Sequence, residues 1–176
     1  MEEKKKKVNG RKKGNTAELK ICRFLSEWWM NRDLTGTKAQ DLPFRRSPLS
    51  GGWDRSRASG DIIKPDNCRL CVEVKNRQEW KWDQFFTSPN GWKVFQYWEQ
   101  TIKAVTKDEI PLLIFTRNNH PYYVAMEINK FNECKKYQKD LKTLILINHK
   151  DLRLAFLYMS EFIKINPILF ARNPVL

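Results

Sequence analysis

The sequence predicts a single α/β domain, in which helices flank a mixed central sheet. Its length of 176 residues suits one domain. Segments with helical periodicity alternate with short β-branched segments, in the order helix, strand group, helix, strands, helices. Hydrophobic residues make up 41% of the chain, which is enough for a sizeable core. We expect a basic arm over residues 1–14, the folded domain over residues 15–165 and a tail over residues 166–176.

The chain is strongly basic, with 33 Lys and Arg against 20 Asp and Glu and a formal charge of +13. Residues 1–14 hold seven bases and two acids, so they contribute +5 and leave +8 on the folded part. Because they hold almost nothing apolar, we expect them to form a flexible arm. Such an excess of positive charge attracts polyanions, so DNA or RNA is the expected partner. A basic surface kept for solubility is the alternative.

The location of the protein follows from what the sequence lacks. No apolar run approaches the ~20 residues that span a bilayer, and no amphipathic basic helix suits a membrane surface. The amino terminus lacks the apolar stretch of a secretory signal, so we expect a cytoplasmic protein whose four Cys are free thiols. Cys68 and Cys71 form a CxxC pair, but no second pair accompanies it, which disfavours zinc.

The first half of the domain begins with a helix and continues with a loop. Asn15 suits the N-cap of a helix that ends near Asp33, and its buried stripe has three- and four-residue spacing. This stripe comprises Ile21, Cys22, Leu25, Trp28 and Trp29. Residues 35–60 are rich in Gly, Ser, Pro and Arg, which indicates a functional loop with a short strand near residues 42–46. The sequence then predicts a hairpin, with strands at residues 61–63 and 69–75 and a turn at residues 64–67.

The second half alternates helices and strands. We expect a helix over residues 92–105, two strands over 111–116 and 122–126, a helix over 130–139 and a strand over 143–147. Apolar residues from Leu152 to Ile163 have helical spacing and predict a last helix. Eight aromatic residues between Trp80 and Trp98 indicate core or dimer packing, with base stacking as the alternative.

Residues 70–75 place an acid and a base on one face of a strand. Alternation puts Glu73 and Lys75 on one side and Val72 and Val74 on the other. Asp61 opens the preceding strand, so its carboxylate can be brought beside Glu73. Two carboxylates are hard oxygen ligands that suit Mg²⁺, and a nearby ammonium can orient a nucleophile or steady a phosphate. A salt-bridge cluster on a solvated sheet face is the alternative.

These motifs, taken in order, resemble those of a nuclease family. The chain resembles the PD-(D/E)XK nuclease superfamily, which has a restriction-endonuclease-like fold. The resemblance lies in a helix that carries Glu18, followed by Ser59-Gly60-Asp61-Ile62 and then by Val72-Glu73-Val74-Lys75. Within this superfamily, the chain is similar to archaeal-type Holliday junction resolvases and to resolvase-like nucleases of phages. Residues 13–18 and 46–51 also fit, and the similarity runs from residue 14 to residue 126. No counterpart is matched after about residue 139.

The resemblance implies roles for individual residues. It implies that Asp61 and Glu73 bind Mg²⁺, for which Mn²⁺ can substitute, and that Lys75 lies near the attacking water. Glu18 would be a further acidic contributor, although it also sits at N3 of a helix capped by Asn15, the place of a capping-box Glu.

Other residues are candidates with open alternatives. Ser50 would lie near the scissile phosphate, with Ser47 as its competitor, and either suits a simple turn. The superfamily often adds a Gln on the following helix, where Gln96 and Gln100 are one turn apart; a solvated helix face is the alternative. Basic side chains in the arm and around the Ser-Gly loop are expected to grip DNA phosphates, or only to solvate the loop. With Ser47, the expected DNA contacts are Lys12, Lys13, Arg45, Arg46, Arg55 and Arg57.

The sequence thus predicts a Mg²⁺-dependent endonuclease that acts on branched DNA. The resemblance implies a Holliday junction resolvase-like enzyme, paired as a two-fold homodimer and working in phage recombination or repair, in the host cytoplasm if phage-encoded. A restriction- or repair-type endonuclease on linear or flap DNA would keep the same site. A module that binds DNA and never cuts it is the alternative from another class.

Overall fold

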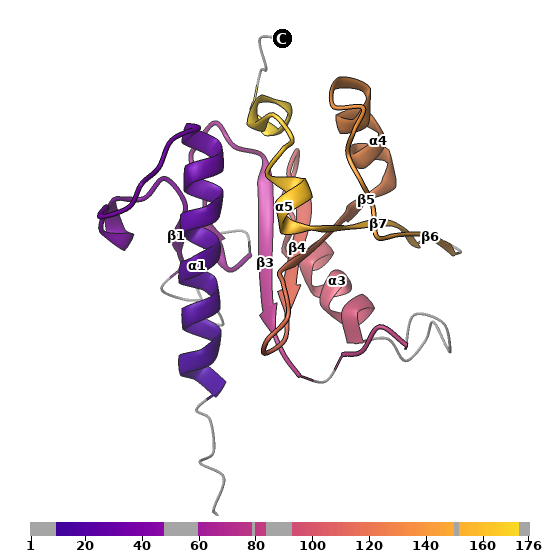
Figure 1. Cartoon of the computed structure of the whole chain (residues 1–176), viewed down its shortest axis with the longest axis horizontal. Helices are drawn as coiled ribbons and strands as arrows, with labels where there is room; N and C mark the ends of the chain where they lie inside the picture. The colour runs from indigo at the N-terminus through magenta and orange to yellow at the C-terminus, as the bar shows by residue number, and fades with distance from the viewer. Residues whose placement is uncertain (1–9, 48–59, 79, 84–92, 150–151, 173–176) are drawn as a thin grey trace, which may run out of the picture.

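The computed structural model describes residues 10–47, 60–78, 80–83, 93–149 and 152–172 (Figure 1). Three predicted site residues, Ser50, Arg55 and Arg57, lie outside these ranges. For Lys12 and Lys13, the structure describes the backbone but not the side chain. Within the described residues, no helix is both long and apolar enough to cross a bilayer.

The centre of the fold is a mixed sheet of five strands. In spatial order these are β3 (Leu70–Asn76), β4 (Ile110–Thr116), β5 (Tyr123–Glu127), β7 (Leu152–Tyr158) and β6 (Ile145–His149). Strands β3 and β4 are parallel, and each other neighbouring pair is antiparallel. A separate two-stranded sheet joins β1 (Arg45–Arg46) to β2 (Ile62–Ile63).

Helices cover both faces of the five-stranded sheet. Helices α1 (Gly10–Met30), α4 (Ile128–Tyr137) and α5 (Met159–Phe162) share one hydrophobic core with it, as does the 3-10 turn η3 (Pro167–Phe170). Helix α3 (Lys93–Ala104) and Trp80 form a second core on the opposite face. Figure 1 shows α1 and α3 on either side of β3 and β4. The predicted α/β class, with a mixed central sheet flanked by helices, is confirmed.

The first helix starts earlier than its capping signal indicates. It begins at Gly10, so Asn15 lies inside α1 and the predicted N-cap is wrong. Arg and Lys are good helix formers, so basic residues extend a helix whose later turns are held by packing. The predicted stripe is buried from Ile21 to Trp28, although Trp29 is only half-buried. Residues 10–14, which the sequence placed in a flexible arm, are therefore part of α1.

The predicted hairpin of residues 61–75 is wrong. The turn exists, because the Cys68 amide donates to the Pro65 carbonyl over 2.9 Å, but β2 pairs with β1 and β3 pairs with β4. A strand that is buried on both faces needs an apolar neighbour. All seven residues of β4 are buried, so β4 supplies that neighbour from forty residues further along the chain. Local turn chemistry therefore did not decide the pairing.

The predicted last helix is also wrong. Residues 152–158 form β7, a central strand between β5 and β6, and only residues 159–162 are helical. Residues 154–157 are all buried, and periodicity cannot separate such an apolar run from a buried helix. The expected tail also packs onto the domain, since Leu169 and Phe170 are buried and the Arg172 amide donates to the Asn67 carbonyl over 2.6 Å.

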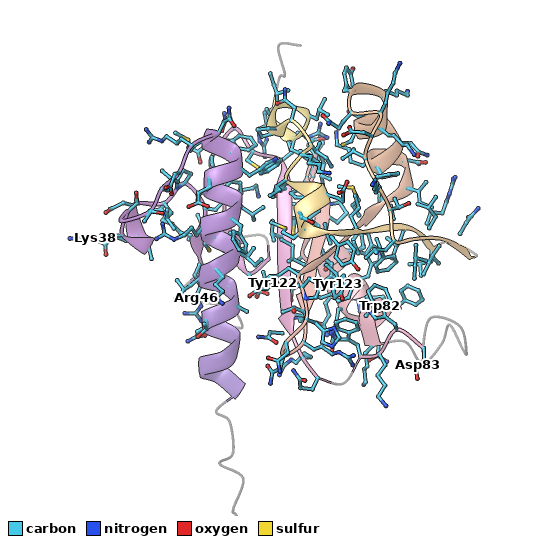
Figure 2. All side chains as sticks on the ribbon, viewed as in Figure 1. Lys38, Arg46, Trp82, Asp83, Tyr122 and Tyr123 are labelled. Atoms are coloured by element: carbon cyan, nitrogen blue, oxygen red, sulfur yellow. The ribbon has the colours of Figure 1, made fainter. Side chains whose placement is uncertain are left out.

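The described aromatic residues that follow β3 belong to the second core, as packing rather than base stacking predicts, whereas Phe85, Phe86 and Trp92 lie outside the described residues. Trp80 is fully buried, and Phe95, Tyr97 and Trp98 of α3 are buried with it. Trp82 packs edge-on against Tyr123 at 4.9 Å, on the side of the sheet away from α1 (Figure 2). All four Cys side chains are buried free thiols.

Candidate active site

Asp61 is anchored to the outer edge of β3 by backbone contacts. Its amide donates to the Val72 carbonyl over 2.9 Å, and the Val74 amide donates to Asp61 Oδ2 over 2.9 Å. Gly60 makes this approach possible, because its φ is +80° and an added Cβ would overlap the Val72 carbonyl oxygen. The Gly-Asp pair thus places a carboxylate beside β3.

Glu73 and Lys75 project from β3 on one face, as the alternation predicted. Their register partners on β4 are Leu113 and Phe115, which belong to the core on the α3 side. Glu73 is 9% exposed, and its Oε1 forms an ion pair with the Nζ of half-buried Lys75. The acid and the base are therefore in direct contact.

Asp61 and Glu73 interact through their charges. Burial raises the pKa of Asp61, against the opposing effects of the Val74 amide, Lys75 and Arg46. Burial also raises the pKa of Glu73, and the negative charge of Asp61 raises it further, against the effect of Lys75. Two carboxylates in a water-poor place repel each other, and a bound cation relieves that repulsion.

Glu18 and Arg46 complete a cluster of charges. Glu18 on α1 is 9% exposed and forms an ion pair with Arg46 Nε from β1. Figure 2 shows Arg46 beside α1. The charge of Glu18 contributes to the raised pKa of Glu73, and that of Arg46 opposes the rise at Asp61. The capping-box role for Glu18 is wrong, because α1 begins eight residues earlier. Glu18 thus lies close enough to Glu73 for its charge to act on that carboxylate.

The donor set fits a hard divalent cation. Asp61 and Glu73 offer carboxylate oxygens, and Mg²⁺ is usually held by one or two acids together with waters and substrate phosphate. Across the described part of the chain, no group of three or more His, Cys, Asp or Glu is arranged to hold a metal by itself. A metal at this site would therefore take its remaining ligands from water and phosphate.

The other predicted residues divide into those near the site and those away from it. Ser47 is buried, and its amide donates to the Asp61 carbonyl over 2.9 Å, while Arg45 is exposed on β1. Gln96 and Gln100 are both exposed on α3. Gln96 accepts a hydrogen bond from Lys93, and no hydrogen bond among the described residues joins either Gln to Glu73 or Lys75.

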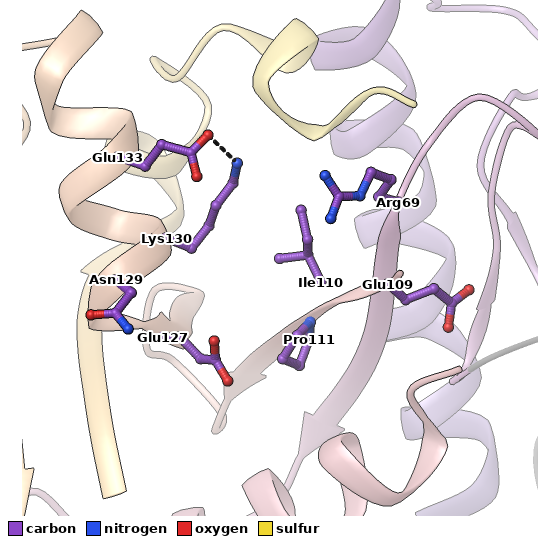
Figure 3. A pocket seen from close by; sticks show the side chains of 8 residues that line it. All are labelled: Arg69, Glu109, Ile110, Pro111, Glu127, Asn129, Lys130 and Glu133. Carbon is purple, nitrogen blue, oxygen red and sulfur yellow. Dashed lines mark hydrogen bonds and ion pairs between the residues drawn. The ribbon is translucent and has the colours of Figure 1, made fainter. Parts of the chain in front are cut away.

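Two features were missed by sequence reasoning. The ion pair between Glu18 and Arg46 joins residues 28 positions apart, and no local pattern signals such a pairing. A cavity of about 300 Å³ opens near the amino ends of β3 and β4, between Arg69, Ile110 and Lys130 (Figure 3). It contains none of the predicted site residues, which gather further along β3.

Comparison with known proteins assigns the family. A family model described as "Phage putative PDDEXK endonuclease" matches residues 9–168, a range that contains Glu18, Asp61, Glu73 and Lys75. It also contains the stretch after residue 139, for which the motifs offered no counterpart. No curated protein and no solved structure matches the chain. Nucleases of this superfamily generally depend on a divalent metal. With its restriction-endonuclease-like fold, the chain belongs to this family of phage PD-(D/E)XK endonucleases.

Proposed function

We propose that the protein is a Mg²⁺-dependent endodeoxyribonuclease that cuts branched DNA, most simply four-way junctions. The observation that carries the proposal is the pair of half-buried Asp61 and buried Glu73, held at one edge of β3 with Lys75 in contact with Glu73. Family membership supports nuclease activity. The preference for branched DNA rests on the resolvase-like order of motifs from Glu18 through residues 46–51 to Lys75.

The site residues have separate tasks in this proposal. The Val74 amide fixes the orientation of the Asp61 carboxylate, and Lys75 fixes that of Glu73, so both acids are preorganised as ligands. Asp61 and Glu73 would hold Mg²⁺, or Mn²⁺ in its place, and the cation would supply charge neutralisation at the phosphate and a more acidic water. The Lys75 ammonium positions the attacking water, and Arg46 steadies the phosphate from the β1 side.

The proposal extends to the assembly and its setting. A four-way junction has two strands to cut, so a two-fold homodimer suits it. Its proposed setting is recombination or repair of phage DNA in the host cytoplasm, for which the match to a phage endonuclease family supports the phage origin alone. The amino end of α1 lies at the same end of the molecule as the carboxyl end of β3 (Figure 1), and the proposal keeps Lys12 and Lys13 of this first turn as DNA contacts.

A substrate panel tests the proposal. Purified protein with Mg²⁺ is incubated with a four-way junction, a flap and a linear duplex of the same sequence. The expected result is preferential nicking of the junction, abolished by Asp61→Asn and by Lys75→Ala. The matched control is Lys136→Ala, an exposed Lys on α4, which should cut like the wild type.

Two outcomes would contradict parts of the proposal. Equal or faster cutting of linear duplex or flap would favour a restriction- or repair-type nuclease that uses the same residues. Tight, salt-sensitive binding that Mg²⁺ does not affect, without cleavage of any substrate, would leave a DNA-binding module. Dimer formation is checked independently by sedimentation of the free protein and of its junction complex.

A further inference from the structure

Two Arg residues lie at the carboxyl ends of the parallel strands β3 and β4. Arg117 directly follows Thr116, the last residue of β4, and Arg77 directly follows Asn76, the last residue of β3. Asn76 and Thr116 are register partners, and the Arg77 amide donates to the Thr116 carbonyl over 3.1 Å. The two Arg residues are thus neighbours, and Arg77 lies two residues past Lys75. Ligands of open α/β sheets characteristically bind at this end of the strands.

Arg117 is held over a rigid aromatic platform. Its guanidinium carbon lies 5.5 Å from the centre of the Trp80 ring. The Trp80 ring is fully buried and meets Phe115 and Tyr123 edge-on, at 5.0 and 5.5 Å between ring centres. A guanidinium stacked on a fixed ring keeps its charge and loses little conformational freedom when it binds an anion.

The positive charge of Arg117 is poorly compensated within the protein. Its Nη1 donates to the Trp80 carbonyl at 3.5 Å, the limit of a hydrogen bond, and its Nε is buried without a hydrogen-bond partner. No ion pair among the described residues includes Arg117 or Arg77. A partly buried cation without an acid is costly, and a bound anion would offset that cost.

Other half-buried cations of the described chain do have their charge compensated. Lys75 and Arg46 contact Glu73 and Glu18. Arg23 has no acid, but its guanidinium donates to the Leu34 and Thr37 carbonyls over 2.5 and 2.9 Å. Arg117 has no acid and a single hydrogen bond to a carbonyl at the limiting length of 3.5 Å, which distinguishes it from a cation used only to brace the fold.

The turn that carries Arg117 is fixed from inside. The hydroxyl of buried Thr116 lies 3.0 to 3.1 Å from the carbonyl oxygens of Arg117, His120 and Pro121, so it donates to this group of acceptors. The His120 amide also donates to the Arg117 carbonyl over 3.1 Å. A preorganised turn lowers the ordering cost of binding.

We propose that Arg117 and Arg77 form a phosphate-binding site for the DNA backbone, next to the phosphate that is cut. Two residues of extended chain separate Arg77 from Lys75 by about 7 Å, which places this site beside the catalytic ammonium. The site would grip DNA from the ends of β3 and β4, whereas Arg45 and Arg46 approach from β1. The assignment rests on the proposed nuclease function for its DNA ligand.

Binding measured without cleavage tests the site. A fluorescent four-way junction is titrated in metal-free buffer at several salt concentrations with wild type, Arg77→Ala, Arg117→Ala and Arg117→Lys. Each Ala variant should bind about tenfold more weakly and lower the slope of log affinity against log salt by about 1. Arg117→Lys should keep the slope but lose part of the affinity, because Lys lacks the planar fork. The matched control is Arg153→Ala, an exposed Arg on β7, which should match the wild type.

Distinct outcomes would overturn the assignment. If both Ala variants match Arg153→Ala in affinity and slope, no phosphate binds there. If Arg117→Ala lowers only the melting temperature, Arg117 is a structural brace; if that variant fails to fold, exposed Arg77→Ala alone decides. Stabilisation by inorganic phosphate without any change in DNA affinity would mean that the site takes the free anion. Wild type that binds with the predicted slope and cuts nothing would contradict the nuclease proposal alone.

Discussion

The amide of Val74 donates a hydrogen bond to Oδ2 of Asp61 over 2.9 Å, so the strand that carries Glu73 and Lys75 also orients the second carboxylate. The two acids approach each other because Gly60 lets the chain run against the edge of β3. The geometry of the site therefore depends on a backbone contact as much as on the acidic side chains.

Gly60→Ala should destabilise the protein and reduce cleavage. The new Cβ would overlap the Val72 carbonyl at a φ of +80°, so the segment that carries Asp61 must move. We expect a loss of about 2 to 3 kcal/mol in the free energy of unfolding, measured by denaturant titration. Gly36→Ala is the matched control, because its φ is +85° but nothing lies within 4 Å of the new Cβ. Gly36→Ala should lose about 1 kcal/mol and keep full cleavage activity; equal effects at both positions would contradict the account.

Removing one of the two site carboxylates should stabilise the metal-free protein at neutral pH. Asp61→Asn or Glu73→Gln removes the repulsion that helps to raise the pKa of Glu73. An increase of roughly 2 to 4 °C in melting temperature corresponds to about 1 kcal/mol for a chain of this size. Glu99→Gln, an exposed acid on α3, is the control and should leave the melting temperature unchanged. A lower melting temperature in both site variants would show that the carboxylates do not repel.

The metal-free wild type should lose stability as the pH rises. Because the pKa values of Asp61 and Glu73 are higher in the folded chain than in the unfolded chain, the folded state holds more protons in the weakly acidic range. The contribution of these two groups to the free energy of unfolding therefore falls as the pH rises through their folded-state pKa values. Mg²⁺ should restore stability at neutral pH in the wild type and not in Asp61→Asn. Melting curves across pH, with chelator or with Mg²⁺, provide the measurement.

Glu18 and Arg46 should act as one unit in catalysis. Each is held by the other, so Glu18→Gln and Arg46→Gln should each lower kcat/KM, and the double variant should lose less than the sum of the two effects. Because the Arg46 side chain is 28% exposed, the expected coupling is about 1 kcal/mol. Additive losses in the double-mutant cycle would mean that the two residues work separately.

The four thiols should be inert in the folded protein. All four Cys are buried, and burial raises the pKa of Cys22 to about 12 and those of Cys68 and Cys134 to about 11. The thiolate is the reactive form, so a thiol reagent at neutral pH should modify none of them quickly and all of them in denaturant. A fast-reacting thiol in the native protein would contradict the burial described here.

Strand β3, which carries the candidate site, could be predicted because its signal is local. Alternation from Val72 to Lys75 separates polar from apolar side chains, and that separation survives whichever strand pairs with β3. Pairing itself depends on contacts between distant segments, which is why the predicted hairpin and the true β3 and β4 pair differ. Residues 154–157 show the same limit, since burial on both faces removes the periodicity that separates strand from helix.

Partners brought together by the fold escaped prediction for a related reason. The sequence indicates that Arg46 is a loop residue that contacts DNA, but in the structure it also forms an ion pair with Glu18. Arg117 lies in a polar turn, and its contact with Trp80, which is 37 residues away in the sequence, could not be predicted from that turn. The order of short motifs nevertheless sufficed to identify the superfamily, because its acids and Lys occupy adjacent strand segments.

The central claim is that Asp61 and Glu73 jointly bind the cation that supports cleavage. The most direct measurement compares single-turnover cleavage of one DNA substrate by wild type, Asp61→Asn, Glu73→Gln and Glu99→Gln over a Mg²⁺ titration. We predict that each site variant cuts roughly 100-fold or more slowly at saturating Mg²⁺, while Glu99→Gln follows the wild type. Cleavage by Asp61→Asn and Glu73→Gln at the wild-type rate, with the same dependence on Mg²⁺, would contradict the claim.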